Sequence, residues 1–466
     1  MEPGQTLSGT VRFQSAAKIR DTDVTSFTSK GVFLLAYGRG EMSGGSGSMS
    51  SLRWRHLRLG RAMAEKIQTL YSARAAGFLT AILTGDKSGL AEGDAIALSE
   101  AGLYHIMAVS GMHCGFLLTL ASLLTGRRRR LTAALAMPLL AFYALLTGGS
   151  PSVVRACVML AFLLAAPLCR RDSDPPTALA AALFLILLVN PFAAASVSLQ
   201  LSFAAMAGLL WLTPKLMKLL AGERRRGRAF RLLSASFSAT IGALVFTTPL
   251  TAWYFGRLVL VSPLSNLLCL WAAGLVFMAG LLSVAAGFVW TPLGAALALL
   301  PRALTGYILG AARLLAGIPY HALYYTNPYL KYWLAYAYVL FALAYVLRPE
   351  RRRKYAAAAL LAALTLVVTV GLGQRRCRAD LDVLVLNVGQ GQCVLLASEG
   401  RFALVDCGSG NSWISAGDIA ADHLASLGCK QLDYLILTHC DSDHVSGVTA
   451  LAERLRIGVL LAPETA

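Results

Sequence analysis

The chain has 466 residues, of which 56% are hydrophobic and only 14% are charged. Soluble domains carry about 25% charged residues, so this composition excludes a soluble globular enzyme and also excludes an intrinsically disordered chain. The formal net charge is +18 at pH 7, and in so apolar a chain the positions of the basic residues matter more than their sum.

The first 50 residues are polar and rich in turn residues. Two stretches, beginning at Thr6 and at Gly31, alternate with the two-residue period of a β-strand. Two strands alone cannot bury a core. We therefore expect residues 1–50 to be part of a β domain, with partner strands upstream of Met1.

Residues 52–82 predict one amphipathic, basic helix within a helical region over residues 51–100. Apolar side chains recur at helical spacing and arginines surround them; the apolar positions are Met63, Ile67, Leu70 and Tyr71. Two interpretations remain open. The helix lies in the membrane interface with its arginines near lipid phosphates, or it binds an anionic substrate.

Apolar runs follow one another through residues 101–373. Each is about 17–25 residues long, enough to cross roughly 30 Å of hydrocarbon. The sequence therefore predicts about ten transmembrane helices, at residues 104–125, 131–148, 151–168, 176–190, 195–213, 232–250, 263–287, 292–317, 330–347 and 355–373.

Basic residues gather in the breaks after the first, third, fifth and ninth of these segments. Short cytoplasmic loops retain lysine and arginine. All four breaks fall on one side of the membrane, which predicts that this side is cytoplasmic. Residues 1–103 and everything after residue 373 are then expected outside the cytoplasm.

Polar side chains inside the apolar segments are candidates for a water-filled path, because such groups are costly in hydrocarbon. They are His113, Arg155, Gln200, Ser202 and Asn266. The alternative is structural: Ser, Asn and Gln also form hydrogen bonds between packed helices, and Arg155 can extend its head group to the membrane interface.

The composition changes after residue 380, where short strands alternate with glycine turns and predict a soluble α/β unit. The strand YLILT is followed at once by the sequence THCDSDH, which contains His439, Asp441, Asp443 and His444. Imidazole and carboxylate groups at a strand end suit Zn²⁺ or Mn²⁺, with a metal-bound water as nucleophile. The alternative is a solvated acidic turn.

THCDSDH resembles the metallo-β-lactamase-type domain of the ComEC DNA-uptake family, together with Asp406 in LVDCG and the turn NVGQGQ. Blocks of the apolar region resemble that family's competence domain in the same order. They include AGLYHIMAVSGMHCG from Ala101, PSVVRA from Pro151 and LQLSF from Leu199. The first 50 residues resemble part of its OB-like domain.

The resemblance implies a membrane channel that passes single-stranded DNA to the cytoplasm during natural transformation. It also implies that His439, Asp441, Asp443 and His444 hold a divalent metal, with Asp443 essential for catalysis and Asp406 supporting the site. The implied partners are DNA, membrane lipid, a DNA receptor on the outer face, a cytoplasmic motor and, in some assemblies, further copies of the chain. No nucleotide-binding motif is present, so energy has to come from a partner.

Two features depart from the family pattern. Asn387 and Gln392 stand where that family's turn usually carries carboxylates, and the later metal ligands of such a domain would lie beyond Ala466. We therefore expect residues 380–466 to be the N-terminal half of the domain, in a chain truncated at both ends.

The fold class predicted is a polytopic α-helical membrane protein with an OB-like β fragment and a partial α/β metallo-β-lactamase-type domain. Two alternative functions remain open. One is a membrane-anchored, metal-dependent DNA phosphodiesterase that degrades the strand that is not imported, inactive in this truncated chain. The other is a small-solute transporter.

Overall fold

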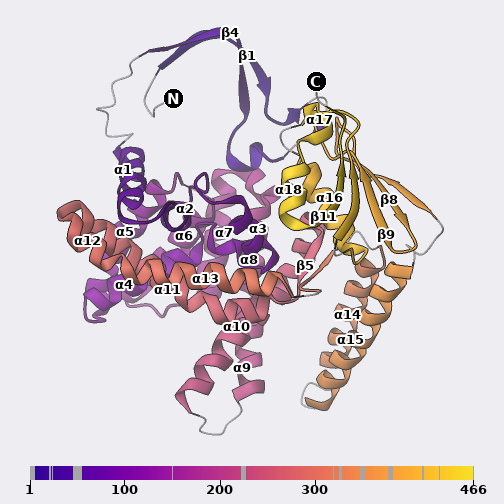
Figure 1. Cartoon of the computed structure of the whole chain (residues 1–466). Helices are drawn as coiled ribbons and strands as arrows, with labels where there is room; N and C mark the ends of the chain where they lie inside the picture. Colours follow the sequence, from indigo (N-terminus) through magenta and orange to yellow (C-terminus); the bar gives the residue numbers. More distant parts are fainter. Residues whose placement is uncertain are drawn as a thin grey trace. The chain divides into compact units, whose positions relative to one another are not determined.

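The computed structural model contains two compact units, which are described separately (Figure 1). One comprises Met1–Leu250 with Val261–His321, and the other comprises Thr251–Leu260 with Ala322–Ala466. The structure describes residues 6–19, 22–23, 25–45, 55–149, 151–221, 227–318, 320–324, 328–346, 352–375, 381–411, 414–429 and 431–464.

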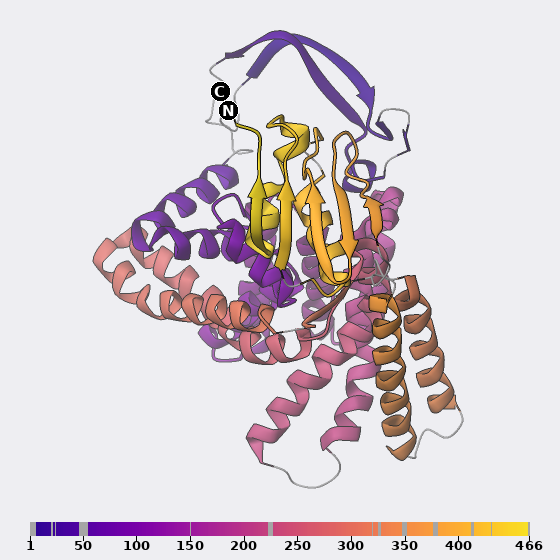
Figure 2. The ribbon, with the colours of Figure 1, turned by 45° about the vertical axis from the view of Figure 1, so that its right-hand side comes forward.

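The polar N-terminal region forms a long β-hairpin (Figure 2). Strands β1 (Thr6–Ser15) and β4 (Leu34–Gly45) pair antiparallel. Two short strands, β2 (Lys18–Ile19) and β3 (Thr22–Asp23), pair with each other inside the connection, before the 3-10 turn η1 (Thr28–Lys30). The predicted pair of strands is confirmed, whereas the OB-like assignment stays a prediction.

The prediction of one amphipathic helix over residues 52–82 is wrong, because the chain breaks at Ser72. That residue has extended backbone angles between α1 (Arg55–Leu70) and α2 (Ala73–Thr84). Met63 and Ile67 of α1 are buried, as their spacing predicts. In α2, every residue from Ala75 to Leu83 is buried, so this helix is a core element and has no polar face.

The apolar region folds into helices, and seven helical stretches among the described residues are long and apolar enough to cross a membrane. Two of them consist of two helices each. The π-helical turn η5 (Gly208–Leu212) joins α8 to α9, and the single residue Ala298 separates α12 from α13. The seven are α5 (Arg129–Leu146), α8 (Val197–Ala207) with α9 (Thr213–Ala221), α10 (Arg228–Phe255), α11 (Ser262–Val289), α12 (Thr291–Leu297) with α13 (Leu299–Ala316), α14 (Pro328–Val346) and α15 (Arg352–Arg375).

Each of the ten predicted segments contains a helix. Helix α4 (Gly111–Leu124) is shorter than the segment predicted for it, whereas α6 (Pro151–Leu168) and α7 (Pro175–Val189) agree with their predicted bounds to within one residue. Upstream of α4 lie α3 (Glu92–Glu100) and the 3-10 turn η3 (Tyr104–Ile106); η4 (Pro191–Ala195) is a similar turn after α7. The chain is thus a multi-pass membrane protein, and its orientation stays a prediction. Parts of the basic breaks, at residues 222–226 and 347–351, lie outside the described residues.

The C-terminal region forms a five-stranded mixed sheet in the order β11-β10-β9-β8-β7 (Figure 2). The strands are β7 (Asp382–Val385), β8 (Val394–Ser398), β9 (Arg401–Val405), β10 (Gln431–Ile436) and β11 (Arg456–Leu461). Strands β9, β10 and β11 run parallel to one another, whereas β8 pairs antiparallel with β7 and with β9. A separate two-stranded sheet joins β5 (Arg257–Val259) to β6 (Ala322–Tyr324).

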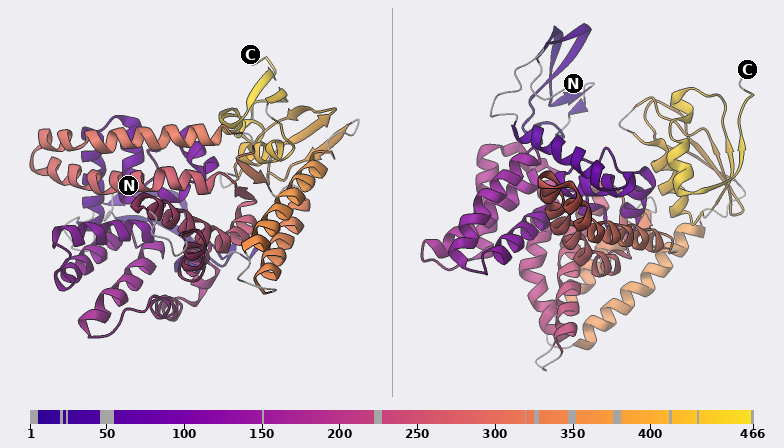
Figure 3. Two further views of the ribbon diagram at one scale, coloured as in Figure 1. Left: turned by 90° about the horizontal axis from the view of Figure 1, so that it is seen from below. Right: turned by 60° about the vertical axis from the view of Figure 1, so that its left-hand side comes forward.

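Helices cover one face of the five-stranded sheet (Figure 3). They are α16 (Ala416–Ser426), the short α17 (Ser442–Val445) and α18 (Val448–Arg454). Leu424 of α16 and Leu451 of α18 belong to one buried cluster with Leu404 and Leu435 of the central strands. This core fixes the end of β10, where the predicted metal ligands begin.

A buried carboxylate ties three elements of the helical unit together. Asp94 of α3 is 1% exposed and accepts two hydrogen bonds from Arg74 of α2, each 2.7 Å long. Arg313 of α13 donates a third to the same carboxylate at 2.9 Å. Burial raises the pKa of Asp94, but the hydrogen bonds and charge of Arg74 and the charge of Arg313 outweigh burial and hold the pKa below its usual value.

We expect Asp94→Asn to lower the free energy of unfolding by about 2 kcal/mol near neutral pH, because charge-assisted hydrogen bonds are lost. A carboxylate with a depressed folded pKa stabilises the protein above its unfolded pKa of about 4, and this stabilisation is lost as the pH falls through the folded value. The difference between variant and wild type should therefore shrink below about pH 4. The measurement is the melting temperature of the detergent-solubilised chain against pH. Glu92→Gln, on the exposed side of the same helix, is the control, and an equal loss from it would contradict the prediction.

Candidate metal centre

The predicted metal ligands lie in the loop and short helix that follow β10. This strand lies between β9 and β11 and runs parallel to both. The chain leaves the sheet after Ile436, passes His439 and Asp441, and begins α17 at Ser442. Because β10 is paired on both sides and buries Leu432 and Leu435, the loop starts from a fixed point at the carboxyl end of the strands.

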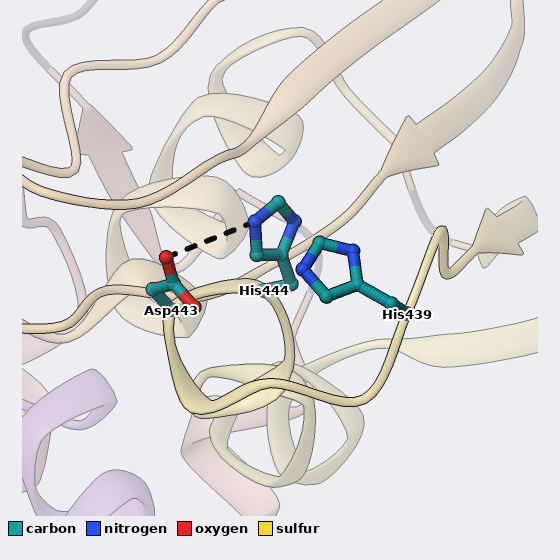
Figure 4. Close-up of side chains that lie close together, drawn as sticks. All are labelled: His439, Asp443 and His444. Carbon is teal, nitrogen blue, oxygen red and sulfur yellow. Dashed lines mark ion pairs between the residues drawn. The ribbon is translucent and has the colours of Figure 1, made fainter.

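Three side chains come together there: His439, Asp443 and His444 (Figure 4). Each offers one ligand atom, and these atoms all lie within 4.8 Å of one another. The two imidazole rings lie with their centroids 3.7 Å apart, and His444 Nε2 lies 3.8 Å from Asp443 Oδ2. Asp441, the fourth predicted ligand, lies outside this group, with Oδ2 3.7 Å from His439 Nε2 and its side chain exposed.

Asp406 lies directly beneath these groups, at the end of β9. It is fully buried and adopts left-handed backbone angles, with φ at +56°. Its carboxylate accepts hydrogen bonds from the backbone N–H of Thr438 at 2.8 Å and from the Thr438 hydroxyl at 2.7 Å. It also accepts one from His444 Nδ1 at 2.8 Å.

These bonds decide which nitrogen of each imidazole carries a proton. An ionised carboxylate can only accept, so His444 Nδ1 carries the hydrogen and leaves the lone pair of Nε2 available. The Thr438 hydroxyl gives its hydrogen to Asp406, so its oxygen accepts from His439 Nδ1 at 3.0 Å. Both imidazoles therefore have Nε2 available as a ligand atom, in the arrangement that orients metal-binding histidines.

The pKa of Asp406 is consistent with this network. Burial on its own would raise the pKa, but the hydrogen bonds from the Thr438 backbone N–H, from His444 and from the Thr438 hydroxyl lower it below the usual value. The carboxylate is therefore ionised at neutral pH, as an acceptor of three hydrogen bonds has to be.

Two glycine turns bring the backbone close to α17. A Cβ atom on Gly408 would lie 2.4 Å from the backbone nitrogen of His444, and one on Gly391 would lie 2.8 Å from the Asp443 carbonyl oxygen. Glycine at both positions lets Cys407 N–H donate to His444 O at 2.8 Å and Gln392 N–H donate to Asp443 O at 3.1 Å. The LVDCG and NVGQGQ turns thus hold the backbone of two candidate ligands.

The sequence analysis missed the role of Thr438. Its position as the first residue of THCDSDH was the available signal, but the bond to Asp406 joins residues far apart in the chain. Gln392 contacts the site through its backbone alone among the interactions described, and Asn387 accepts a hydrogen bond from Gly389 N–H. Their amides carry no charge.

The donor set fits a divalent metal. Two imidazole nitrogens and a carboxylate oxygen suit Zn²⁺ or Mn²⁺, and three protein ligands leave a coordination position for water, as in catalytic zinc sites. The five polar residues predicted to line a path come from four different helices, α4, α6, α8 and α11. His113, Arg155 and Asn266 are 0%, 2% and 7% exposed, and Gln200 and Ser202 are half-buried.

Comparison with known proteins gives the same division of the chain. A family described as Competence protein matches residues 82–352, and the Metallo-beta-lactamase superfamily matches residues 386–466. No solved structure matches.

Two curated relatives cover most of the chain. Competence protein ComA of Neisseria gonorrhoeae is 30% identical over 410 residues, which is 81% of this chain and 52% of that protein. ComE operon protein 3 of Bacillus subtilis (strain 168) is 24% identical over 447 residues, or 89% and 54%. The chain thus spans about half the length of these relatives. With more than half of its residues matched by the first of these families, the chain belongs to the competence proteins, and its C-terminal region belongs to the metallo-β-lactamase superfamily.

Proposed function

We propose that this chain forms the membrane part of a channel that passes single-stranded DNA across the cytoplasmic membrane during natural transformation. The observation that carries the proposal is the match of residues 82–352 to the competence family, over a region rich in apolar helices. In this proposal the β-hairpin and the lactamase-like region lie outside the cytoplasm, as the basic breaks favour. A DNA receptor outside and a motor inside complete the system.

The residues proposed for the strand path are His113, Arg155, Gln200, Ser202 and Asn266. Arg155 is the strongest of them, because a guanidinium binds phosphate through charge and a planar set of donors. Among the described residues, no ion pair involves it, and its Nη2 donates to Ser152 Oγ at 3.1 Å and to Ser198 O at 2.8 Å. The other four are neutral groups that would allow phosphates to pass without trapping them.

We expect deletion of the intact gene to leave labelled duplex DNA bound at the cell surface and to abolish its protection from added nuclease. The reason is that binding and passage are separate steps and only passage needs the channel. The measurement separates surface-bound from nuclease-protected label in competent cells.

Complementation supplies the matched control. Arg155→Gln should leave label bound but unprotected, whereas Arg170→Gln, in the exposed loop after α6, should restore protection. Undiminished protection in the deletion strain would refute the channel and favour a phosphodiesterase or a small-solute transporter.

We further propose that His439, Asp443 and His444, with Asp441 as a fourth ligand, hold Zn²⁺ or Mn²⁺. When bound, such an ion would supply a water activated for attack on a phosphodiester. The chain's own residues orient the two imidazoles through Thr438 and Asp406, and Asp443 provides the negative ligand on which activity would depend.

Asp406→Asn is expected to weaken metal binding by about 10–100-fold, as loss of an orienting carboxylate typically does. An amide oxygen is a weaker, uncharged acceptor for His444 Nδ1 and Thr438. The measurement is zinc affinity of the purified chain by competition with a chromophoric chelator. Asp433→Asn is the control, since the carboxylate of Asp433 accepts from Phe402 N–H, away from the ligand group. Equal affinities for wild type and Asp406→Asn would argue against the proposed site.

A second function is favoured by the convergence of three ligand atoms within 4.8 Å: a metal-dependent phosphodiesterase that degrades the strand that is not imported. In the intact protein, Asp443→Ala should then abolish release of acid-soluble label from incoming DNA while protected label still accumulates. The assay follows both fractions from strand-specifically labelled duplex. Unchanged release from the variant would exclude this activity.

A further inference from the structure

Two buried cysteines lie beside the candidate metal centre, where the pairing of β8 with β9 ends. Cys393 immediately precedes β8, and Cys407 follows β9 after one intervening residue. Their side chains are 1% and 0% exposed and belong to the same buried cluster of the lactamase-like region. Both are free thiols in the structure, which is therefore that of the reduced form.

Backbone pairing places these cysteines opposite each other. The ladder is regular up to the first residue of β8 and the last residue of β9, which form a pair. The next bond runs from Gly408 N–H to Gln392 O at 3.1 Å. Between these two contacts the chain before β8 has one residue, Cys393, and the chain after β9 has two, Asp406 and Cys407. The strands thus end in a β-bulge, in which two residues oppose one.

The spacing suits a disulfide. Opposed residues of antiparallel strands have Cα atoms about 4.5–5.5 Å apart, and a disulfide joins Cα atoms about 4.4–6.8 Å apart. The two side chains interact, because a hydrogen bond to Cys393, together with burial, raises the pKa of the Cys407 thiol. Asp406, the other residue of the bulge, directs its carboxylate to Thr438 and His444 instead. Cys407 is therefore the residue of the bulge that meets Cys393.

The same two segments hold the backbone of the candidate ligands. Cys407 N–H donates to His444 O at 2.8 Å, and Cys407 O accepts from Gly447 N–H at 2.8 Å, so this residue is bonded to α17 and to the chain just after it. On the other segment, Gln392 N–H donates to Asp443 O at 3.1 Å. A covalent bond between the cysteines would therefore join the two turns that position α17.

We propose that Cys393 and Cys407 form a disulfide that holds these two turns in the geometry that metal binding requires. The inference rests on the metal site proposed above and on the proposed position of this region outside the cytoplasm, where disulfides persist. It adds a modification site to the lactamase-like region and makes the strength of metal binding depend on the redox state of the chain.

The bond forms by exchange with a disulfide of another molecule, which is the oxidant. The thiolate of one cysteine attacks that disulfide, forms a mixed disulfide and releases a first thiol. The second cysteine then attacks the sulfur of the first and releases the other thiol. The two protons and two electrons that the cysteines lose convert the disulfide of the oxidant into two thiols. Because both sulfurs are buried in the folded chain, this exchange takes place before the turns close.

Peptide mapping tests whether the bond is present. N-ethylmaleimide is added to intact competent cells and kept present through denaturation, and the protein is purified without reductant. Trypsin cuts after Arg401, between the two cysteines, so the bond is expected to join the peptide of residues 379–401 to that of residues 402–430. The second peptide also contains Cys429, so Cys429→Ala should keep the linked pair. Alkylation of both Cys393 and Cys407 in the wild type would overturn the proposal.

Zinc affinity, measured by competition with a chromophoric chelator, tests what the bond does. Wild-type chain that carries the bond is expected to bind zinc severalfold more tightly than Cys393→Ala, because a site already held in its bound geometry loses less freedom on binding. Wild-type chain reduced with tris(2-carboxyethyl)phosphine should match Cys393→Ala. Cys429→Ala is the control and should match the oxidised wild type. Cys429 is a buried thiol of the same cluster, but it donates to Gln431 O at 3.2 Å, away from the bulge.

The outcomes separate the disulfide from the metal site. A linked peptide pair with equal zinc affinities for the oxidised and reduced wild type would overturn the role proposed for the bond. Absence of zinc binding by both forms would instead refute the metal site of the proposed function, and the linked peptides would still establish the disulfide.

Discussion

A polar group removed from water needs a partner, and this constraint shapes both regions of the chain. In the lactamase-like region it is met almost completely. Asp406 is buried, ionised and supplied with three hydrogen-bond donors by Thr438 and His444. The left-handed backbone of Asp406 is tolerated because Ile436 O accepts from its N–H at 2.8 Å and the neighbouring strands hold it in place.

The helical unit meets the same constraint less completely. Ser110 begins α4 with its N–H and side chain bonded to His113, so the imidazole closes the end of a short helix that lies inside the protein. Helix α2 has 12 residues, about 18 Å at 1.5 Å per residue, and is too short to cross roughly 30 Å of hydrocarbon. A helix too short to cross the hydrocarbon layer is tolerated where other protein surrounds it. The buried residues of α2 have such surroundings. Arg155 is one of several buried groups that depart from this constraint, because only one of its three guanidinium nitrogens has a partner among the described residues.

Apolar runs and periodicity in the sequence were enough to predict a helix in each of the ten apolar segments and the two long strands of the N-terminal hairpin. They could not locate helix ends, because hydropathy responds to composition and not to backbone angles. Residues 106–109 are all apolar and continue the apolar run of the following helix, yet residues 104–106 form a 3-10 turn and Ser110 is extended. The break at Ser72 was not predicted for the same reason. The ligand motif was visible because four of its members lie within six consecutive residues, whereas the Thr438 bond to Asp406 depends on the parallel pairing of β9 with β10.

Gln392 bears on the charge around the candidate ligand group. Its backbone N–H donates to the Asp443 carbonyl oxygen, which places this exposed residue next in space to the backbone of one candidate ligand. A carboxylate there would strengthen binding of a cation and would also repel the phosphates of an approaching strand. Because the amide of Gln392 is uncharged, it gives neither the stronger cation binding nor the repulsion of phosphates. If this region acts on DNA, as proposed, the weaker repulsion matters more, because phosphates arrive in succession while a metal ion needs to be bound only once.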